Sequence, residues 1–185
     1  IHVNTAEMEI IRETDTMVVN NPESNMGNAV GISPVLQLYR HGILLGMGTD
    51  AYTNDMLESL KVALCCQRHN ACLPNVGWCE VTDMLFKNNA KIGARYFETP
   101  LGVLKPGAAA DIIVMDYKPF TPFSDENIDG HMIFGMTGRQ CQTTIANGRV
   151  LMLDRELVGV DEEVENAHIL EAAKKLWGEL NHRTY

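Results

Sequence analysis

The sequence has no hydrophobic run long enough to cross a membrane, and it is poor in basic residues. Its longest apolar runs, such as residues 43–47 and 112–115, are far shorter than the roughly 20 residues of a membrane-spanning helix. It has 15 Lys and Arg against 24 Asp and Glu, a formal net charge of −9. Because nucleic acids and anionic membranes attract positive surfaces, we expect neither as a partner. The expected ligand is a small molecule or a protein.

The cysteines are few and do not form a pattern. Their number is odd, two are adjacent, and none are paired in the C-x-x-C spacing by which a turn presents two thiolates to one zinc ion. We therefore expect free, buried thiols on and after a helix, in a protein of the reducing cytoplasm. The cysteines are Cys65, Cys66, Cys72, Cys79 and Cys141.

A complete set of metal ligands is also missing. A catalytic zinc normally has three or more protein ligands, whereas this chain offers one well-placed carboxylate, Asp50, and one candidate histidine, His2. The chain begins without Met and without a signal-peptide pattern, so we expect it to be part of a longer protein. The other histidines are expected on the surface: His41, His69, His131, His168 and His182.

The 185 residues are 45% hydrophobic and 21% charged, enough for one sizeable core. The first part, residues 1–97, alternates amphipathic helical patterns with short apolar runs, which predicts an α/β fold. Runs without polar alternation are typical of parallel strands that are buried on both faces. Strands are predicted at 16–19 and 43–47, and helices at 5–14, 34–40, 56–68 and 81–96.

The pattern changes after residue 97. Residues 98–160 contain glycines, prolines and short β-like runs at 112–115, 142–145 and 149–153, which predict a small β unit. Residues 161–185 begin with acidic residues and continue with an apolar stripe, which predicts a C-terminal helix that packs on the rest of the chain.

Asp50 is the strongest candidate for a catalytic residue. The segment GILLGMGTD places its carboxylate directly after a buried strand, where parallel α/β folds gather their reactive groups. A carboxylate there can bind a divalent metal and move a proton from the activated water. It can equally cap the helix that follows, and spacing alone does not separate the two roles.

A second polar segment follows the preceding strand. NNPESNMGN places amides, a hydroxyl and a turn-forming proline after residues 16–19, which suits either binding of a polar ligand or stabilisation of a loop. The candidate pocket residues are Asn20, Asn21, Ser24 and Asn25, with His2 before the first helix as a further candidate.

The order of these segments resembles the C-terminal half of the amidohydrolase superfamily. NNPESN, GMGTD, TPLGVLKPGAAADIIVMDY and TTIANGRVLMLD follow one another as in its deaminase and chlorohydrolase branch, and the resemblance covers essentially all residues. It implies the C-terminal portion of a metal-dependent (β/α)8 TIM barrel, part of a small composite β-sandwich and a C-terminal helix. An intact barrel needs about 250 residues, so only its last β/α units are expected here.

The resemblance also implies roles for individual residues. Asp50 resembles the aspartate after the eighth strand, which binds the metal and acts as general base or proton shuttle. The metal would be divalent, zinc or alternatively iron, and held only in the intact protein, because the family's histidine ligands cannot be placed here. His2 would be a pocket-loop residue. Two positions depart from the branch, which commonly has histidine where Asn20 stands and glycine where Ala51 stands.

Three functional hypotheses follow. The first is hydrolysis of a C–N bond in a cyclic amidine or nitrogen heterocycle by the intact protein, as in deamination. The second is hydrolytic dechlorination of a triazine-like ring at the same site. The third is an inactive fragment or interaction module, whose exposed strand edges would demand a partner. Expected partners are a heterocyclic small molecule, together with a second copy or the missing N-terminal part.

Overall fold

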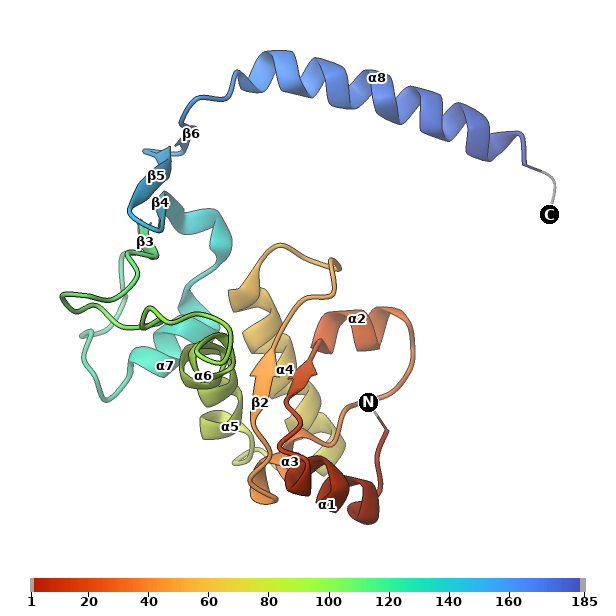
Figure 1. The fold of residues 1–185 in the computed structure, drawn as a ribbon, viewed down its shortest axis with the longest axis vertical. Coiled ribbons are helices and arrows are strands. Elements are labelled where there is room, and N and C mark those ends of the chain that lie inside the picture. Colours follow the sequence, from red (N-terminus) through yellow and green to blue (C-terminus); the bar gives the residue numbers. More distant parts are fainter. Residues whose placement is uncertain (1, 184–185) are drawn as a thin grey trace.

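The computed structural model describes residues 2–183, which form an α/β part, an antiparallel sheet and a long helix (Figure 1). The α/β part has two parallel strands among helices, as the sequence predicted. Its elements are α1 (Thr5–Glu13), β1 (Val18–Asn20), α2 (Pro22–Gly27), α3 (Val35–Arg40), β2 (Leu45–Met47), α4 (Met56–Ala71), α5 (Trp78–Asp83), a π-helical turn (Met84–Asn88) and α6 (Asn89–Gly93).

The parallel pair β1–β2 positions the two polar segments. Val18 is paired with Leu45 and Asn20 with Met47, so the carboxyl ends of both strands lie at one edge. The chain passes from β1 into α2 and from β2 into the loop that carries Asp50. Residues 27 positions apart in the sequence are thereby brought together.

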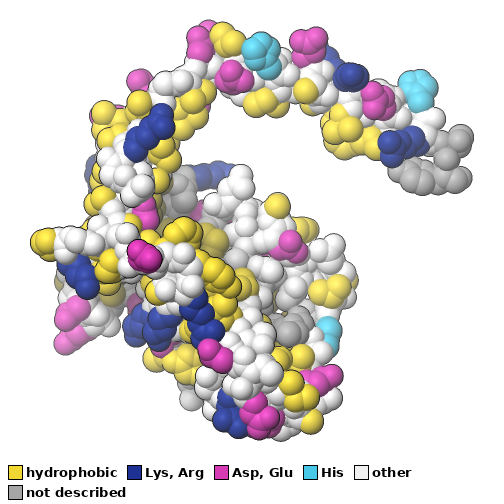
Figure 2. Space-filling model, viewed as in Figure 1, with side chains coloured by type: hydrophobic (Ala, Val, Ile, Leu, Met, Phe, Trp, Pro, Cys, Tyr) yellow, Lys and Arg dark blue, Asp and Glu magenta, His cyan; other side chains and the backbone are white. Residues whose placement is uncertain are grey.

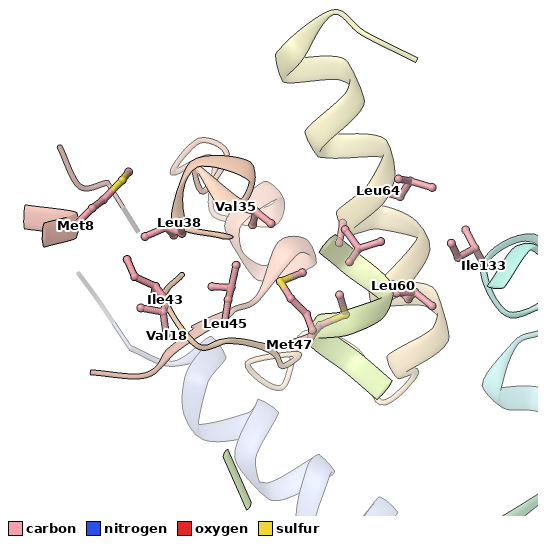
Figure 3. Packing of buried hydrophobic residues seen from close by; sticks show 13 residues of the cluster. Met8, Val18, Val35, Leu38, Ile43, Leu45, Met47, Leu60, Leu64 and Ile133 are labelled. Atoms are coloured by element: carbon pink, nitrogen blue, oxygen red, sulfur yellow. The ribbon is translucent and has the colours of Figure 1, made fainter. Parts of the chain in front are cut away.

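The hydrophobic core lies around β1 and β2 and is covered by α1, α3, α4 and α5 (Figures 1 and 3). All three residues of β2 are buried, which explains its lack of polar alternation. Ile133, from the later part of the chain, also joins the core. The core side chains are Met8, Val18, Val35, Leu38, Ile43, Leu45, Met47, Leu60, Ala63, Leu64, Val81, Met84 and Ile133.

The second part is a four-stranded antiparallel sheet in the order β3-β4-β5-β6. Three of its strands match the sequence prediction, and the short β6 was not predicted. The strand residues are half-buried or exposed, as expected for one layer of a sandwich. The elements are β3 (Ile112–Met115), α7 (Ile128–Gly130), a π-helical turn (His131–Gly135), a 3-10 turn (Gly138–Gln140), β4 (Cys141–Ala146), β5 (Arg149–Leu153) and β6 (Glu156–Leu157).

The final helix, α8 (Glu162–Asn181), forms where it was predicted but does not pack on the rest of the described chain. It projects away from the α/β part, and hydrophobic side chains show on its surface (Figures 1 and 2). The predicted packing is not seen within residues 2–183, because amphipathic spacing fixes which face is apolar without supplying a surface to cover it. No described helix has both the length and the hydrophobicity to cross a membrane. The large exposed side chains of α8 are Val164, Ile169, Leu170, Leu176 and Trp177.

The prediction of buried cysteines is also wrong. All five thiols are free, and each is half-buried or exposed. The buried face of α4 consists of Leu60, Leu64 and their neighbours, so Cys65 points outward and Cys66 lies at the margin. Partial burial raises the pKa of the Cys66 thiol. Helical spacing beside apolar residues was therefore insufficient to place a thiol in the core.

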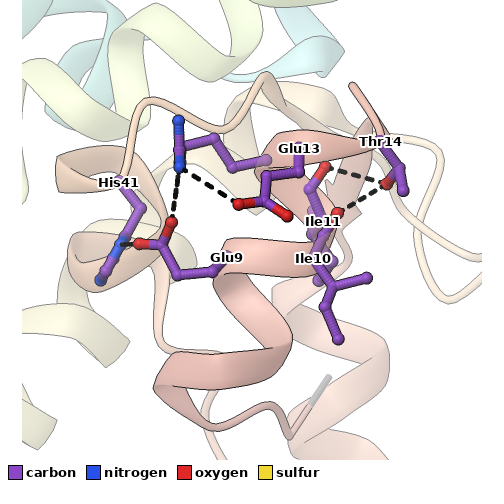
Figure 4. A network of polar contacts seen from close by, with 7 residues as sticks. Glu9, Ile10, Ile11, Glu13, Thr14 and His41 are labelled. Carbon is purple, nitrogen blue, oxygen red and sulfur yellow. Dashed lines mark hydrogen bonds and ion pairs between the residues drawn. The ribbon is translucent and has the colours of Figure 1, made fainter.

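A polar network joins α1 to the end of α3 (Figure 4). Glu9 receives a hydrogen bond from Arg12 at 2.7 Å and lies 3.2 Å from the Nδ1 atom of His41. Thr14 ends α1 by donating to the carbonyl of Ile10 at 2.7 Å. His41 precedes β2, so this network lies at the amino ends of the strands, away from Asp50. In parallel α/β folds that end contributes to stability rather than catalysis.

Candidate active site

Asp50 lies in an exposed loop that begins where β2 ends. Its backbone has a φ of 51° and the following Ala51 has a φ of 54°, so two successive non-glycine residues adopt the left-handed conformation. Such conformations cost about 1–3 kcal/mol each and persist only where neighbouring contacts hold them. The loop that presents the Asp50 carboxylate is therefore shaped by tertiary contacts.

Asp50 does not cap the helix that follows. The N-cap of α4 is Asp55, whose Oδ1 accepts the backbone N–H groups of Leu57 at 3.0 Å and Glu58 at 3.3 Å. The capping role that the sequence left open for Asp50 is thus filled by another residue. The carboxylate of Asp50 instead accepts a hydrogen bond from another part of the chain.

That contact comes from Ser24 in α2. Its hydroxyl donates to the Oδ2 atom of Asp50 at 2.8 Å, which joins the segments after β1 and β2. Pro22 occupies the first turn of α2, a position that needs no N–H donor, and both Pro22 and Ser24 are buried. The structure thus brings together two of the residues singled out in the sequence.

The asparagines of the second polar segment lie close to the same strand ends. Asn20 is only 3% exposed, and its carbonyl accepts the N–H of Gly48 at 3.0 Å. Asn21 precedes α2, and its Oδ1 is so close to Gly48 that a Cβ there would lie 2.5 Å away. Asn20 and Asn25 line one small cavity. Close packing therefore surrounds the strand ends on the α2 side.

His2 precedes α1 and lies against the end of the polar segment that follows β1. Its Nε2 contacts the carbonyl oxygen of Val30, and its ring packs against Gly31. This places the imidazole on the loop between α2 and α3, beside a depression that it shares with Ile32 and Pro34. His2 thus contacts Val30 and takes no part in the hydrogen bond between Ser24 and Asp50.

Two residues of the site were not identified from the sequence. The Asn28 amide donates to Ser24, and the Tyr52 ring lies over Gly27, where a Cβ would come within 2.0 Å of the phenol oxygen. Asn28 belonged to the polar segment but had no distinguishing spacing. Tyr52 follows the candidate Asp50 by two positions and likewise has no distinguishing spacing. Neither contact has a signal in the local sequence, because the partners are brought together by the β1–β2 pairing.

Metal-binding side chains are sparse in the described part of the chain. Within residues 2–183, no group of three or more His, Cys, Asp or Glu side chains converges on one point. Asp50 is exposed, and Ser24 engages only its Oδ2 atom. A carboxylate of this kind fits one position in the ligand set of a divalent metal but not a complete site.

Proteins of similar sequence are deaminases. The chain is 32% identical over 161 residues to the 5-methylthioadenosine/S-adenosylhomocysteine deaminase of Thermococcus onnurineus, which covers 85% of this chain and 37% of the relative. It is 32% identical over 184 residues to the 5'-deoxyadenosine deaminase of Methanothermobacter thermautotrophicus, covering 94% of this chain and 40% of the relative. The chain therefore spans about 40% of the length of these relatives.

Solved structures confirm the predicted fold. A zinc-bound adenosine deaminase from Xanthomonas campestris superposes with a TM-score of 0.82 at 21% identity, covering 96% of this chain and 41% of the other. Atrazine chlorohydrolase TrzN from Arthrobacter aurescens gives 0.72 at 21% identity, covering 91% and 38%. The chain thus has the fold of the C-terminal portion of the barrel. The model of the amidohydrolase family matches residues 1–151. This chain belongs to the amidohydrolase family.

Proposed function

We propose that the full-length protein is a metal-dependent hydrolase that deaminates an adenine nucleoside or a related nitrogen heterocycle. The observation that carries the proposal is the position of Asp50, which follows a buried parallel strand and is held by Ser24 from the neighbouring segment. Reactive groups collect at this edge of parallel α/β folds. The names of the similar deaminases support the substrate class.

Asp50 is the residue of this chain that would bind the metal. Zinc suits the proposal because it is bound in the similar adenosine deaminase structure, and iron is the alternative. When bound, the metal would supply a water molecule whose pKa is lowered towards neutrality. The other ligands would come from parts of the full-length protein outside these residues, since no three His, Cys, Asp or Glu side chains converge within residues 2–183.

The reaction would need one proton acceptor that can also return the proton. Water oxygen forms a bond to the ring carbon that carries the amino group, the C–N bond breaks, and ammonia leaves while the ring gains a carbonyl. One proton of the water ends on the departing nitrogen and the other on the neighbouring ring nitrogen. Asp50 would take the proton from water and deliver it to the departing nitrogen, as a general base and then a general acid. Asn20, Asn21 and Asn25 are proposed to line the substrate side of the pocket, with His2 on its loop.

Deamination is favoured over dechlorination by the sequence relatives. The two relatives described above, each 32% identical, are deaminases, whereas the similarity to atrazine chlorohydrolase is at 21% identity and concerns the fold alone. Asn20 replaces a histidine that is common in this branch, so the substrate need not be the same as in those relatives.

The experiment measures ammonia release from adenosine, 5'-deoxyadenosine and 5'-methylthioadenosine by the full-length, zinc-loaded protein. Chloride release from atrazine is measured in parallel. We expect ammonia from at least one nucleoside and no chloride. Chloride without ammonia would establish dechlorination. Release of neither product would contradict both activities and favour the inactive interaction module.

The role of Asp50 is tested with Asp50→Asn, which keeps the size of the side chain and removes its charge. We expect turnover to fall by at least about 100-fold, because general acid–base catalysis contributes about 10²–10⁴-fold. Asp125→Asn, at an exposed position in the loop before α7, serves as the matched control. Near-normal activity in Asp50→Asn would refute the assignment.

The β unit, α8 and the cysteines support further proposals. The β unit at residues 98–160 would complete a small sandwich, and further polypeptide of the full-length protein or a second copy would cover α8 and the exposed Val19 of β1. Free thiols at all five cysteines support a reducing compartment such as the cytoplasm. Light scattering of the full-length protein would measure its oligomeric state.

A further inference from the structure

Ser24 is buried although its partner is exposed. The residue is 4% exposed, and its hydroxyl donates to Asp50 Oδ2 across 26 positions of sequence. Because this hydroxyl gives its one hydrogen to Asp50, it has none to donate to a substrate, but it can fix the orientation of the side chain to which it donates. The position of Ser24 therefore suits orienting the Asp50 side chain better than lining the pocket, the role expected from the sequence.

The direction of the Ser24 hydrogen bond is fixed by Asn28. The Asn28 amide lies 3.0 Å from the Ser24 carbonyl oxygen and 3.2 Å from its hydroxyl oxygen. A backbone carbonyl only accepts, so the group facing it must be the amide NH₂ of Asn28. That nitrogen only donates, so the Ser24 hydroxyl is the acceptor towards Asn28. Its single hydrogen is then directed to Asp50.

A second contact joins α2 to the same loop. The Tyr52 ring packs over Gly27, which has no Cβ to obstruct it, and the Tyr52 N–H donates to the carbonyl of Thr49 at 3.1 Å. Asp50 and Ala51 adopt left-handed backbone conformations between these contacts. The short helix α2 therefore holds the loop at two points, once through the carboxylate and once through the aromatic ring.

We propose that Ser24 is a positioning residue, aimed by Asn28, that holds Asp50 Oδ2 in one orientation and leaves Oδ1 for the metal. The inference rests on the proposed function and deepens it, because it names the residues that prepare Asp50 for both of its roles. Partners that orient a metal-binding carboxylate typically change metal affinity or activity by about 10–100-fold when removed.

The test compares Ser24→Ala, Ser24→Thr and Asn28→Ala in the full-length protein. Zinc affinity is measured by chelator competition, and kcat and KM are measured on the nucleoside that the wild type turns over. We expect Ser24→Ala to weaken zinc binding or lower kcat about 10–100-fold with KM nearly unchanged. Ser24→Thr keeps the hydroxyl and restores most of the loss, and Ser24→Cys replaces it if the added methyl group prevents folding.

Asn28→Ala should produce a smaller loss, and the double variant should resemble Ser24→Ala, since the two residues act through one hydrogen bond. Thr82→Ala is the matched control, because the Thr82 hydroxyl is also buried but donates within α5, to the carbonyl of Trp78 at 3.1 Å. It should leave zinc affinity and kcat unchanged.

Two results would overturn the proposal. One is unchanged zinc affinity and kcat in Ser24→Ala, and the other is a raised KM with unchanged kcat, which would indicate a substrate contact. Failure of the proposed function is recognised separately. A protein that binds zinc but deaminates no nucleoside still reports the role of Ser24 through its zinc affinity.

Discussion

The side chain of Asn89 makes both backbone hydrogen bonds to Met47 that a neighbouring strand would otherwise make. Its Oδ1 accepts the Met47 N–H at 3.0 Å, and its Nδ2 donates to the Met47 carbonyl at 2.9 Å. Asn88 adds a bond to the carbonyl of Leu45 at 3.0 Å. Since β1 occupies the other side of β2, this short strand has partners on both sides. The expectation of exposed strand edges therefore does not hold for β2.

Asn89→Ala should lower the free energy of unfolding by about 2–3 kcal/mol, because it leaves the Met47 N–H and carbonyl without partners. Urea unfolding followed by circular dichroism measures the change. Asn70→Ala, at an exposed position of α4, should change it by less than about 0.5 kcal/mol. Equal effects of the two substitutions would show that the hydrogen bonds to Met47 do not contribute to the free energy of unfolding.

Ala51→Gly should stabilise the protein by up to about 1 kcal/mol, because glycine adopts a φ of 54° without the steric cost that alanine pays. The same substitution at Ala6, in the first turn of α1, should instead be destabilising by a similar amount. Thermal unfolding of both variants gives the comparison. A loss of stability in Ala51→Gly would mean that the left-handed loop conformation is not the one populated in solution.

Asp55 has two functions at the start of α4, as the N-cap and as the acceptor of the Gly138 N–H at 2.7 Å. Asp55→Ala should therefore cost about 2–3 kcal/mol, the sum of a cap and one further charge-assisted bond. Asn4→Ala removes a cap alone, at α1, whose Met8 is part of the core, and should cost about 1 kcal/mol. Urea unfolding distinguishes them, and a cost at Asp55 no larger than at Asn4 would contradict the tie to Gly138.

The hydrogen bond from Tyr39 to Asp83, at 2.7 Å, makes stability depend on pH at the alkaline end. The bond to Asp83, followed by burial, raises the pKa of Tyr39 to about 12, against about 10 in the unfolded chain. A raised folded pKa contributes stability that is present below pH of about 10 and lost as pH rises towards 12.

Tyr39→Phe should therefore be less stable than the wild type by about 1.5–3 kcal/mol at neutral pH, and the difference should vanish between pH of about 10 and 12. Urea unfolding at intervals from pH 7 to 12 measures it. A difference that persists above pH 12 would show that the lost hydroxyl acts through packing instead of through ionisation of the phenol.

The sequence determined the order of the elements and the place of Asp50. The uninterrupted apolar residues 43–47 identified a buried strand, and the polar residues after it placed Asp50 at its carboxyl end. Helical periodicity likewise located α1, α4 and α8. Helix α2 was missed, because its six residues have no apolar periodicity and it begins at a proline. Its stability comes from burial of Pro22 and Ser24 against the rest of the fold.

Only the tertiary structure decided which polar groups meet. The bonds from Ser24 to Asp50 and from Asn89 to Met47 join residues 26 and 42 positions apart, and neither partner has a local pattern that predicts the other. The exposure of Cys65 and of the apolar face of α8 was decided in the same way. The physical reason is that periodicity reports which side of an element is apolar, whereas hydrogen bonds and burial depend on what chain folding brings opposite it.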